Sequence, residues 1–105
     1  MSKEFNKNKV AVITGGAKKI GRATAKKLAE QGFNILIHTG GKSIEEAKKT
    51  VEIVKEYGVK SNFVDGDLLN LTTINKIKEA AIKLGTPSVL INNAALRINE
   101  DFEKI

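Results

Sequence analysis

The stretch from Val10 to Arg22, VAVITGGAKKIGR, constrains the fold of this chain more than any other part of the sequence. Residues 10–13 are wholly apolar, which is typical of a strand buried on both faces. Glycines follow at 15 and 16, and from Ile20 onward the apolar spacing becomes helical and ends at Gly32. A strand, a glycine turn and a helix in this order bring free backbone N–H groups to the positive end of a helix. The stretch therefore predicts a binding site for a phosphate group.

The remaining sequence repeats this alternation of apolar runs and helical spacing. Strands are predicted at 34–38, 60–64 and 89–91, and helices at about 43–58 and 71–84. Ser43 and Glu46 have the spacing of a capping box at the start of a helix. Strands that alternate with helices of this length are typical of βαβ units. We therefore expect an α/β fold: a Rossmann-type, doubly wound parallel sheet with strand order 3-2-1-4, truncated after the fourth strand.

Length and composition narrow the class of protein. The 105 residues suffice for one small domain, with a polar lead-in at 1–9 and a partial dinucleotide-binding domain at 10–105. The absence of cysteine excludes a disulfide framework and a thiolate metal site. No apolar run is long enough to span a bilayer and the first residues do not resemble a signal peptide, so we expect a cytoplasmic protein with no membrane partner.

The net charge of +6 raises the question of a nucleic-acid partner. The lysines are scattered over three helical segments, and only Tyr57 and four phenylalanines could stack on bases. A solvated lysine-rich surface is therefore favoured over a nucleic-acid-binding face.

The glycine turn excludes two common phosphate-binding loops. Arg22 follows Gly21 where a P-loop needs lysine and then serine or threonine, and Ala17 stands where G-x-G-x-x-G has its second glycine. What remains is T-G-x-x-x-G-x-G, with Lys19 in place of the middle glycine.

With this turn, the chain resembles the short-chain dehydrogenase/reductase family. The matching motifs are TGGAKKIG at 14–21, DL at 67–68 and NNAA at 92–95, each after a predicted strand. The last motif departs from the family's N-N-A-G at Ala95. The resemblance covers the chain from about Lys9 to its end.

The resemblance implies a nicotinamide cofactor site made by the loops that follow the strands. It implies that Gly15 and Gly21 shape the turn under the pyrophosphate and that Ile20 lies against the cofactor. It also implies that Asp67 binds the adenine amino group, with Leu68 beside the ring. The alternative for Asp67 is an ordinary turn aspartate. The adenosine ribose would be lined by Asn93, Ala94 and Ala95.

The loop after the second strand bears on the choice between NADP(H) and NAD(H). An NAD site usually has an acid about 20 residues after the glycines, and none occurs between residues 34 and 43. Hydrogen-bond donors and positive charge occur there instead, at His38, Thr39, Lys42 and Ser43, and Lys18 in the glycine turn can approach them. These groups would stabilise a 2′-phosphate, so NADP(H) is favoured over NAD(H). The alternative is that the two lysines are merely solvated.

Lys19 is expected to reach a phosphate oxygen if its φ is negative. A basic residue here and a histidine-containing second loop are similar to pteridine reductases. The NNAALR stretch at 92–97 resembles 3-oxoacyl-carrier-protein reductases instead. The substrate class therefore stays open between these two.

The family's hydride transfer uses a Tyr-x-x-x-Lys pair with a serine and an asparagine. The only tyrosine, Tyr57, has Ser61 four residues later and is predicted to be a packing residue, so no catalytic residue and no metal site is assigned. The family's catalytic residues would lie beyond Ile105.

Two functions remain. The chain is the NADP(H)-binding N-terminal half of an oxidoreductase that takes a small-molecule carbonyl substrate once completed, or it is a non-catalytic nucleotide-binding or interaction module. The unpaired apolar fourth strand predicts self-association or a partner chain that supplies the missing half.

Overall fold

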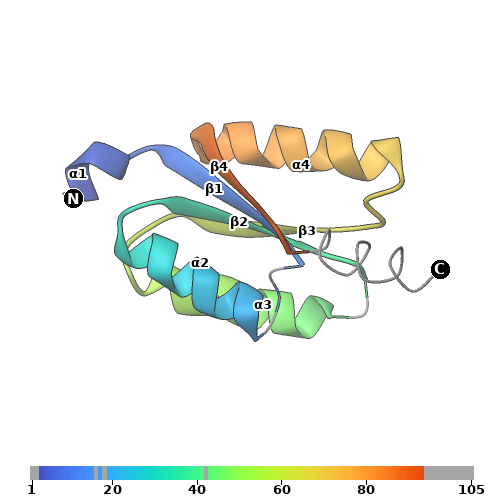
Figure 1. Ribbon diagram of the computed structural model, residues 1–105, viewed down its shortest axis with the longest axis horizontal. Coiled ribbons are helices and arrows are strands. Elements are labelled where there is room, and N and C mark those ends of the chain that lie inside the picture. The colour runs from blue at the N-terminus through green and yellow to red at the C-terminus, as the bar shows by residue number, and fades with distance from the viewer. Residues whose placement is uncertain (1–2, 16, 18, 42, 94–105) are drawn as a thin grey trace, which may run out of the picture.

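The computed structural model describes residues 3–15, 17, 19–41 and 43–93. They form a four-stranded parallel sheet of order β3-β2-β1-β4 between two layers of helices (Figure 1). The strands are β1 (Lys9–Thr14), β2 (Asn34–Thr39), β3 (Ser61–Asp65) and β4 (Thr86–Asn92). The helices are α1 (Lys3–Asn6), α2 (Ile20–Glu30), α3 (Ile44–Lys55) and α4 (Leu71–Leu84). The Rossmann-type fold and the strand order predicted from the sequence are confirmed.

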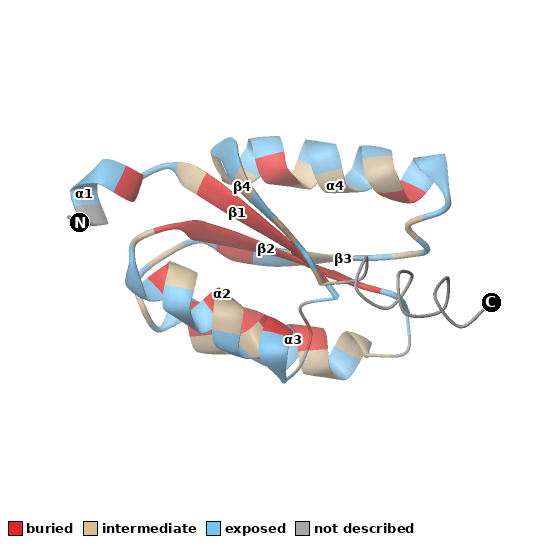
Figure 2. Ribbon diagram, viewed as in Figure 1, coloured by how far each residue is buried: buried red, intermediate tan, exposed pale blue. Residues whose placement is uncertain are grey.

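The core lies on both faces of the two central strands. α2 and α3 cover one face of the sheet and α4 covers the other, and Figure 2 shows the buried residues concentrated along β1 and β2. Ile13, Ile35 and Ile37 pack toward α2 and α3, where small residues such as Ala25 let the helices approach closely. Because every residue of β2 is buried, its central residues Ile35, Leu36 and Ile37 form a continuous apolar run rather than an alternation.

The outer strands differ from the sequence prediction in their bounds. β3 begins one residue later than expected, and β4 extends over Thr86–Asn92 instead of 89–91. The register between β1 and β4 skips Ser88, so β4 contains a bulge next to Pro87. Proline lacks an N–H group to donate, and an edge strand at a bulge is where a sheet tolerates it.

The polar lead-in is joined to the domain by side-chain contacts. Residues 3–6 form the single turn α1, and the Nδ2 of the buried Asn6 donates to the carbonyl oxygen of Gln31 at 2.8 Å. The ammonium of Lys9 lies 3.8 Å from the centre of the Phe5 ring. These contacts hold α1 against the end of α2.

A buried amide that the sequence does not signal connects three elements at the opposite end of the sheet from the glycine turn. Asn34, the first residue of β2, donates through Nδ2 to the carbonyl oxygen of Leu84 at 2.7 Å. Its Oδ1 accepts from the Lys60 N–H at 3.0 Å. The side chain thus replaces backbone partners at the end of α4 and the start of β3.

We expect Gly85→Ala to lower the free energy of unfolding by about 3 kcal/mol. Gly85 ends α4 with φ +148°, and an added Cβ would overlap the carbonyl oxygen of Asn8. Urea titration followed by circular dichroism measures the effect. Gly40→Ala is the control, since an added Cβ there meets no atom within 4 Å. Equal stability of the two variants would contradict the prediction.

Candidate functional site

The carboxyl ends of the four parallel strands lie at one edge of the sheet, and most of the predicted cofactor residues follow them. β1 lies between β2 and β4, so the chain order reverses at β1, which is where open α/β sheets bind ligands. The Thr14 hydroxyl at the end of β1 donates to the Asn92 Oδ1 at the end of β4, at 2.9 Å. This bond fixes the two loops that flank the reversal point.

His38, at the end of β2, connects the glycine turn to the loop after β3. The Gly15 N–H donates to His38 Nδ1 at 3.4 Å, and His38 Nε2 lies 2.8 Å from the carbonyl oxygen of Gly66. Since Nδ1 accepts, we assign the hydrogen to Nε2, which donates to Gly66. His38 is only 3% exposed, so the prediction that it offers a donor to a cofactor phosphate is wrong. Its ring instead joins the glycine turn to the loop after β3 through these two hydrogen bonds.

Thr39 is buried in the same way. It is 3% exposed, and its carbonyl oxygen accepts from the Gly66 N–H at 3.0 Å. The loop after β3 is therefore tied to two successive residues of β2. Gly40 and Gly41, which follow, are exposed at this edge.

Lys19 has the backbone conformation of a glycine. It lies at the N-cap of α2 with φ +54° and ψ −121°, a region that L residues rarely adopt. The negative φ on which the expected contact between Lys19 and a phosphate oxygen depended is therefore not found. The carbonyl oxygen of Lys19 accepts from the Ala23 N–H at 3.0 Å, which starts the helix. Ile20 is 74% exposed, whereas Gly21 is buried.

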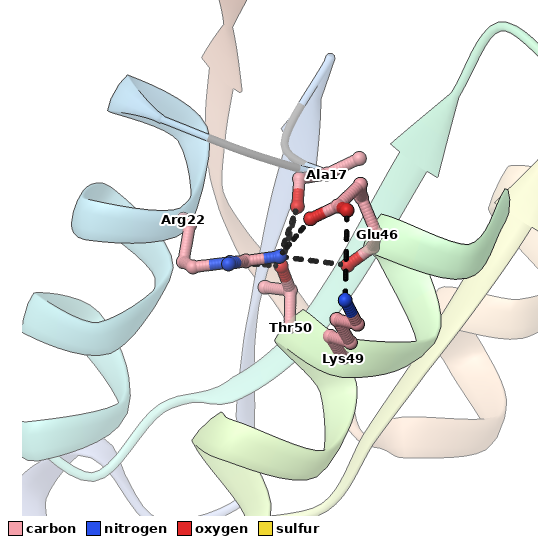
Figure 3. A network of polar contacts seen from close by, with 5 residues as sticks. All are labelled: Ala17, Arg22, Glu46, Lys49 and Thr50. Atoms are coloured by element: carbon pink, nitrogen blue, oxygen red, sulfur yellow. Dashed lines mark hydrogen bonds and ion pairs between the residues drawn. The ribbon is translucent and has the colours of Figure 1, made fainter. Parts of the chain in front are cut away.

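Arg22, to which the sequence analysis assigned no role, joins the glycine turn to α3 (Figure 3). Its Nη2 donates to the Ala17 carbonyl oxygen at 3.2 Å and to the Glu46 carboxylate at 2.9 Å. Its Nε donates to the Thr50 hydroxyl at 2.9 Å, and that hydroxyl donates to the same Ala17 oxygen at 2.5 Å. The sequence signal for this network would have been a basic residue just after the turn, Arg22, together with an acid on the next helix, Glu46.

This network corrects the predicted capping box. Ser43 occupies the N-cap of α3, but its side chain makes no cap hydrogen bond. Glu46, the expected partner, forms an ion pair with Arg22 instead. The Glu46 carboxylate binds the guanidinium of Arg22 on the neighbouring helix rather than a backbone N–H of its own helix.

In the loop after β3, Asp67 has the contact of an ordinary turn aspartate, the alternative to adenine binding considered above. Its Oδ1 accepts from the Leu69 N–H at 2.9 Å, which closes a turn of the aspartate's own loop. Asp67 is exposed, and Leu68 beside it is partly buried. Tyr57 packs against the core cluster under α2 and α3, as predicted.

The structure describes only the first two residues of the NNAA motif at 92–95. Asn93 is partly buried, and its Nδ2 is shielded from solvent with no hydrogen-bond partner among the described residues. Lys18, Lys42, Ala94 and Ala95 lie outside the described residues. The structure thus places Gly15 and Lys19 in the glycine turn and Ile20 and Gly21 at the start of α2. Thr39 ends β2, and the loops that follow the other strands contain Ser43, Asp67, Leu68 and Asn93.

Two absences apply to the described part of the chain. It contains no group of three or more histidine, cysteine or acidic side chains that could hold a metal ion. None of its helices is both long enough and apolar enough to cross a lipid bilayer.

Fold and site together define a Rossmann-type domain with a glycine turn at the reversal point of the sheet. Residues 9–105 match the sequence model of the short chain dehydrogenases, and the chain belongs to this family of oxidoreductases. It is 41% identical over 100 residues to an L-rhamnose 1-dehydrogenase (NADP(+)) from Thermoplasma acidophilum, covering 94% of this chain and 39% of that protein. It is 39% identical over 90 residues to an L-2,3-butanediol dehydrogenase from Corynebacterium glutamicum, covering 85% and 35%.

Solved structures agree with this assignment. A Burkholderia cenocepacia dehydrogenase with bound NADP superposes with a TM-score of 0.74 at 29% identity, covering 83% of this chain and 34% of that one. Acetoin dehydrogenase from Enterobacter cloacae superposes with a TM-score of 0.74 at 31% identity, covering 82% and 34%. The chain spans about a third of the length of the relatives it matches.

We expect His38→Leu to lower the free energy of unfolding by about 2 kcal/mol, because it leaves the Gly15 N–H and the Gly66 carbonyl without their partner. The Gly15 amide should also exchange with solvent faster. His38→Gln, which keeps one donor and one acceptor, should lose about half as much. Urea titration and hydrogen exchange measure these effects. A leucine variant as stable as the wild type would show that the ring bridges nothing.

Proposed function

We propose that this chain binds NADP(H) at the carboxyl edge of its sheet and forms the cofactor-binding part of a short chain oxidoreductase. The observation that carries the proposal is the uncapped start of α2. Lys19 provides no side-chain cap there, and the first turn of α2 contains no acidic residue. By contrast, α3 has two glutamates in its first turn, and the Asn70 side chain caps α4. The start of α2 thus lacks both a side-chain cap and an acid, and we expect its N–H groups to bind an external anion.

The residues at the carboxyl edge of the sheet suggest a position for each part of the cofactor. The pyrophosphate would lie against Gly15, Lys19 and Gly21, with the exposed Ile20 beside it. The adenine would lie at Asp67 and Leu68, and its ribose near Asn93 and the alanines at 94 and 95. A relative named for NADP(+) and a neighbour solved with bound NADP support this choice of ligand.

The preference for NADP(H) over NAD(H) rests on the loop after β2. No carboxylate occurs in the chain between β2 and α3. At the start of α3, Glu45 pairs with Lys48 and Glu46 with Arg22, and the Asp65 carboxylate at the end of β3 lies beside Gly41. Lys42 and Ser43 supply a positive charge and a hydroxyl, and Lys18 a second charge. A 2′-phosphate would be attracted here, whereas an acid would repel it. In a completed enzyme the substrate would be a small carbonyl compound.

NADPH should bind the folded chain, and it should bind about tenfold more tightly than NADH, a difference of about 1.4 kcal/mol. Lys42→Met should reduce that preference to about threefold or less, because it removes a charge beside the 2′-phosphate. Nicotinamide fluorescence on titration measures both constants. Lys55→Met, an exposed lysine at the far end of α3, is the matched control. A protein with intact circular dichroism that leaves NADPH fluorescence unchanged would contradict the proposal.

We also propose that the edge of β4 associates with further polypeptide, in a second copy or in a partner chain that supplies the rest of the enzyme. β4 is an outer strand of the described sheet, and Leu90 on it is 65% exposed. Ile82 on α4 is 67% exposed across an apolar groove that Val12, Ala81 and Pro87 also line. An unprotected apolar edge of this kind favours strand addition.

The chain should therefore elute from size-exclusion chromatography larger than a monomer at micromolar concentration. Leu90→Glu should shift it toward the monomer, because a carboxylate would be desolvated by an added strand or helix. Leu71→Glu, at a residue that is 71% exposed at the start of α4, is the control. A stable, cooperatively unfolding monomer in the wild type would contradict self-association.

A further inference from the structure

The guanidinium of Arg22 holds the middle of the glycine turn from the side of α3. The Ala17 carbonyl oxygen accepts from both Arg22 and the fully buried Thr50 hydroxyl. Arg22 is in turn fixed by Glu46, through its carboxylate and its carbonyl oxygen at 3.1 Å. Only 26% of the Arg22 side chain and 36% of the Glu46 side chain are exposed, so this is not a loose surface pair.

The residues on either side of Lys19 are thereby held in place. Before it, Ala17 is bound to Arg22 and to Thr50 of α3, and after it, Arg22 lies in the first turn of α2. Between them, Lys19 has a φ of +54°, which is unfavourable for a residue with a Cβ. Such a conformation persists only when its surroundings determine it more strongly than the residue's own preference opposes it. The contacts of Arg22 and Thr50 are the ones that do so on the α3 side.

We propose that Arg22 is a positioning residue, which keeps the glycine turn in its phosphate-accepting shape although a lysine occupies a glycine position. The proposal rests on the proposed function, since the phosphate is the cofactor's. In the absence of the guanidinium, Lys19 relaxes to a negative φ, and the turn and the first N–H groups of α2 move off the anion. A glycine at 19 makes the guanidinium dispensable for the shape of the turn.

Four proteins test this: the wild type, Arg22→Met, Lys19→Gly and the double variant, each titrated with NADPH. Arg22→Met should weaken binding about tenfold or more, and Lys19→Gly, which removes a side chain beside the pyrophosphate, provides the reference affinity for the second background. In that glycine background, Arg22→Met should change binding by about threefold at most, because the two effects are coupled. An equal loss in both backgrounds would overturn the proposal.

Two further variants separate geometry from charge. Lys26→Met removes one positive charge from an exposed position on the same helix and should change binding by about twofold at most. Arg22→Lys keeps the charge but not the planar fork that reaches Ala17, Glu46 and Thr50 together, so it should weaken binding as the methionine variant does. It also replaces the methionine variant if that one does not fold. A tenfold loss in Lys26→Met, or full binding in Arg22→Lys, would overturn the proposal.

A measurement without ligand distinguishes failure of the positioning role from failure of cofactor binding. Lys19→Gly should raise the thermal unfolding midpoint by about 5 °C where Arg22 is present, since it removes the strain of a positive φ. It should raise the midpoint by less than half as much where Arg22 is methionine, since the turn has already relaxed. If these shifts appear while NADPH leaves every variant unchanged, the proposed function fails and the positioning role stands. Equal shifts would overturn the positioning role whatever the cofactor does.

Discussion

The turn that leaves β1 must pass from a strand buried on both faces to a helix within a few residues, and the rest of the site depends on how its backbone is held. Among the described residues, the hydrogen bonds to the Gly15 N–H and the Ala17 carbonyl come from side chains outside the turn. Gly15 is bound through its N–H by His38 of β2, and Ala17 is bound through its carbonyl by Arg22 and by Thr50 of α3. The hydrogen bonds that shape the turn therefore come from residues 23 to 33 positions away in most cases.

This arrangement explains which parts of the structure the sequence could predict. The two central strands contain continuous apolar runs, at 10–13 and 35–37, because both of their faces are covered, and the helices carry small apolar residues on the covered side. Because those patterns are local, the sequence alone predicts the strands and helices that carry them. The helix α4 was predicted with its observed bounds from its apolar spacing and from Gly85, which ends it; the cap by Asn70 was not predicted. The bulge at Pro87 was not, since it depends on the register with β1.

The site was less predictable, for a physical reason that Glu46 illustrates. Its spacing from Ser43 is that of a capping box, but a guanidinium at 2.9 Å offers a charged partner where the capping box offers a backbone N–H. His38 was read as a donor for a ligand and proves to be buried between two loops. In both cases the deciding partner comes from a distant part of the chain, and only the fold brings it near. Local spacing contains no information about such pairs.

The two edges of the sheet are protected in different ways, and this links association to the cofactor site. β3 places the polar Asn62 and the charged Asp65 on its edge, whereas β4 contains no charged residue. In β4, the proline and the bulge interrupt the edge near its amino end, which leaves Val89–Asn92 as the part that another strand can join. Asn92 is also the residue whose side chain accepts from Thr14 beside the glycine turn. A strand added to this part of β4 would therefore lie next to the side-chain pair that joins the ends of β1 and β4 beside the glycine turn.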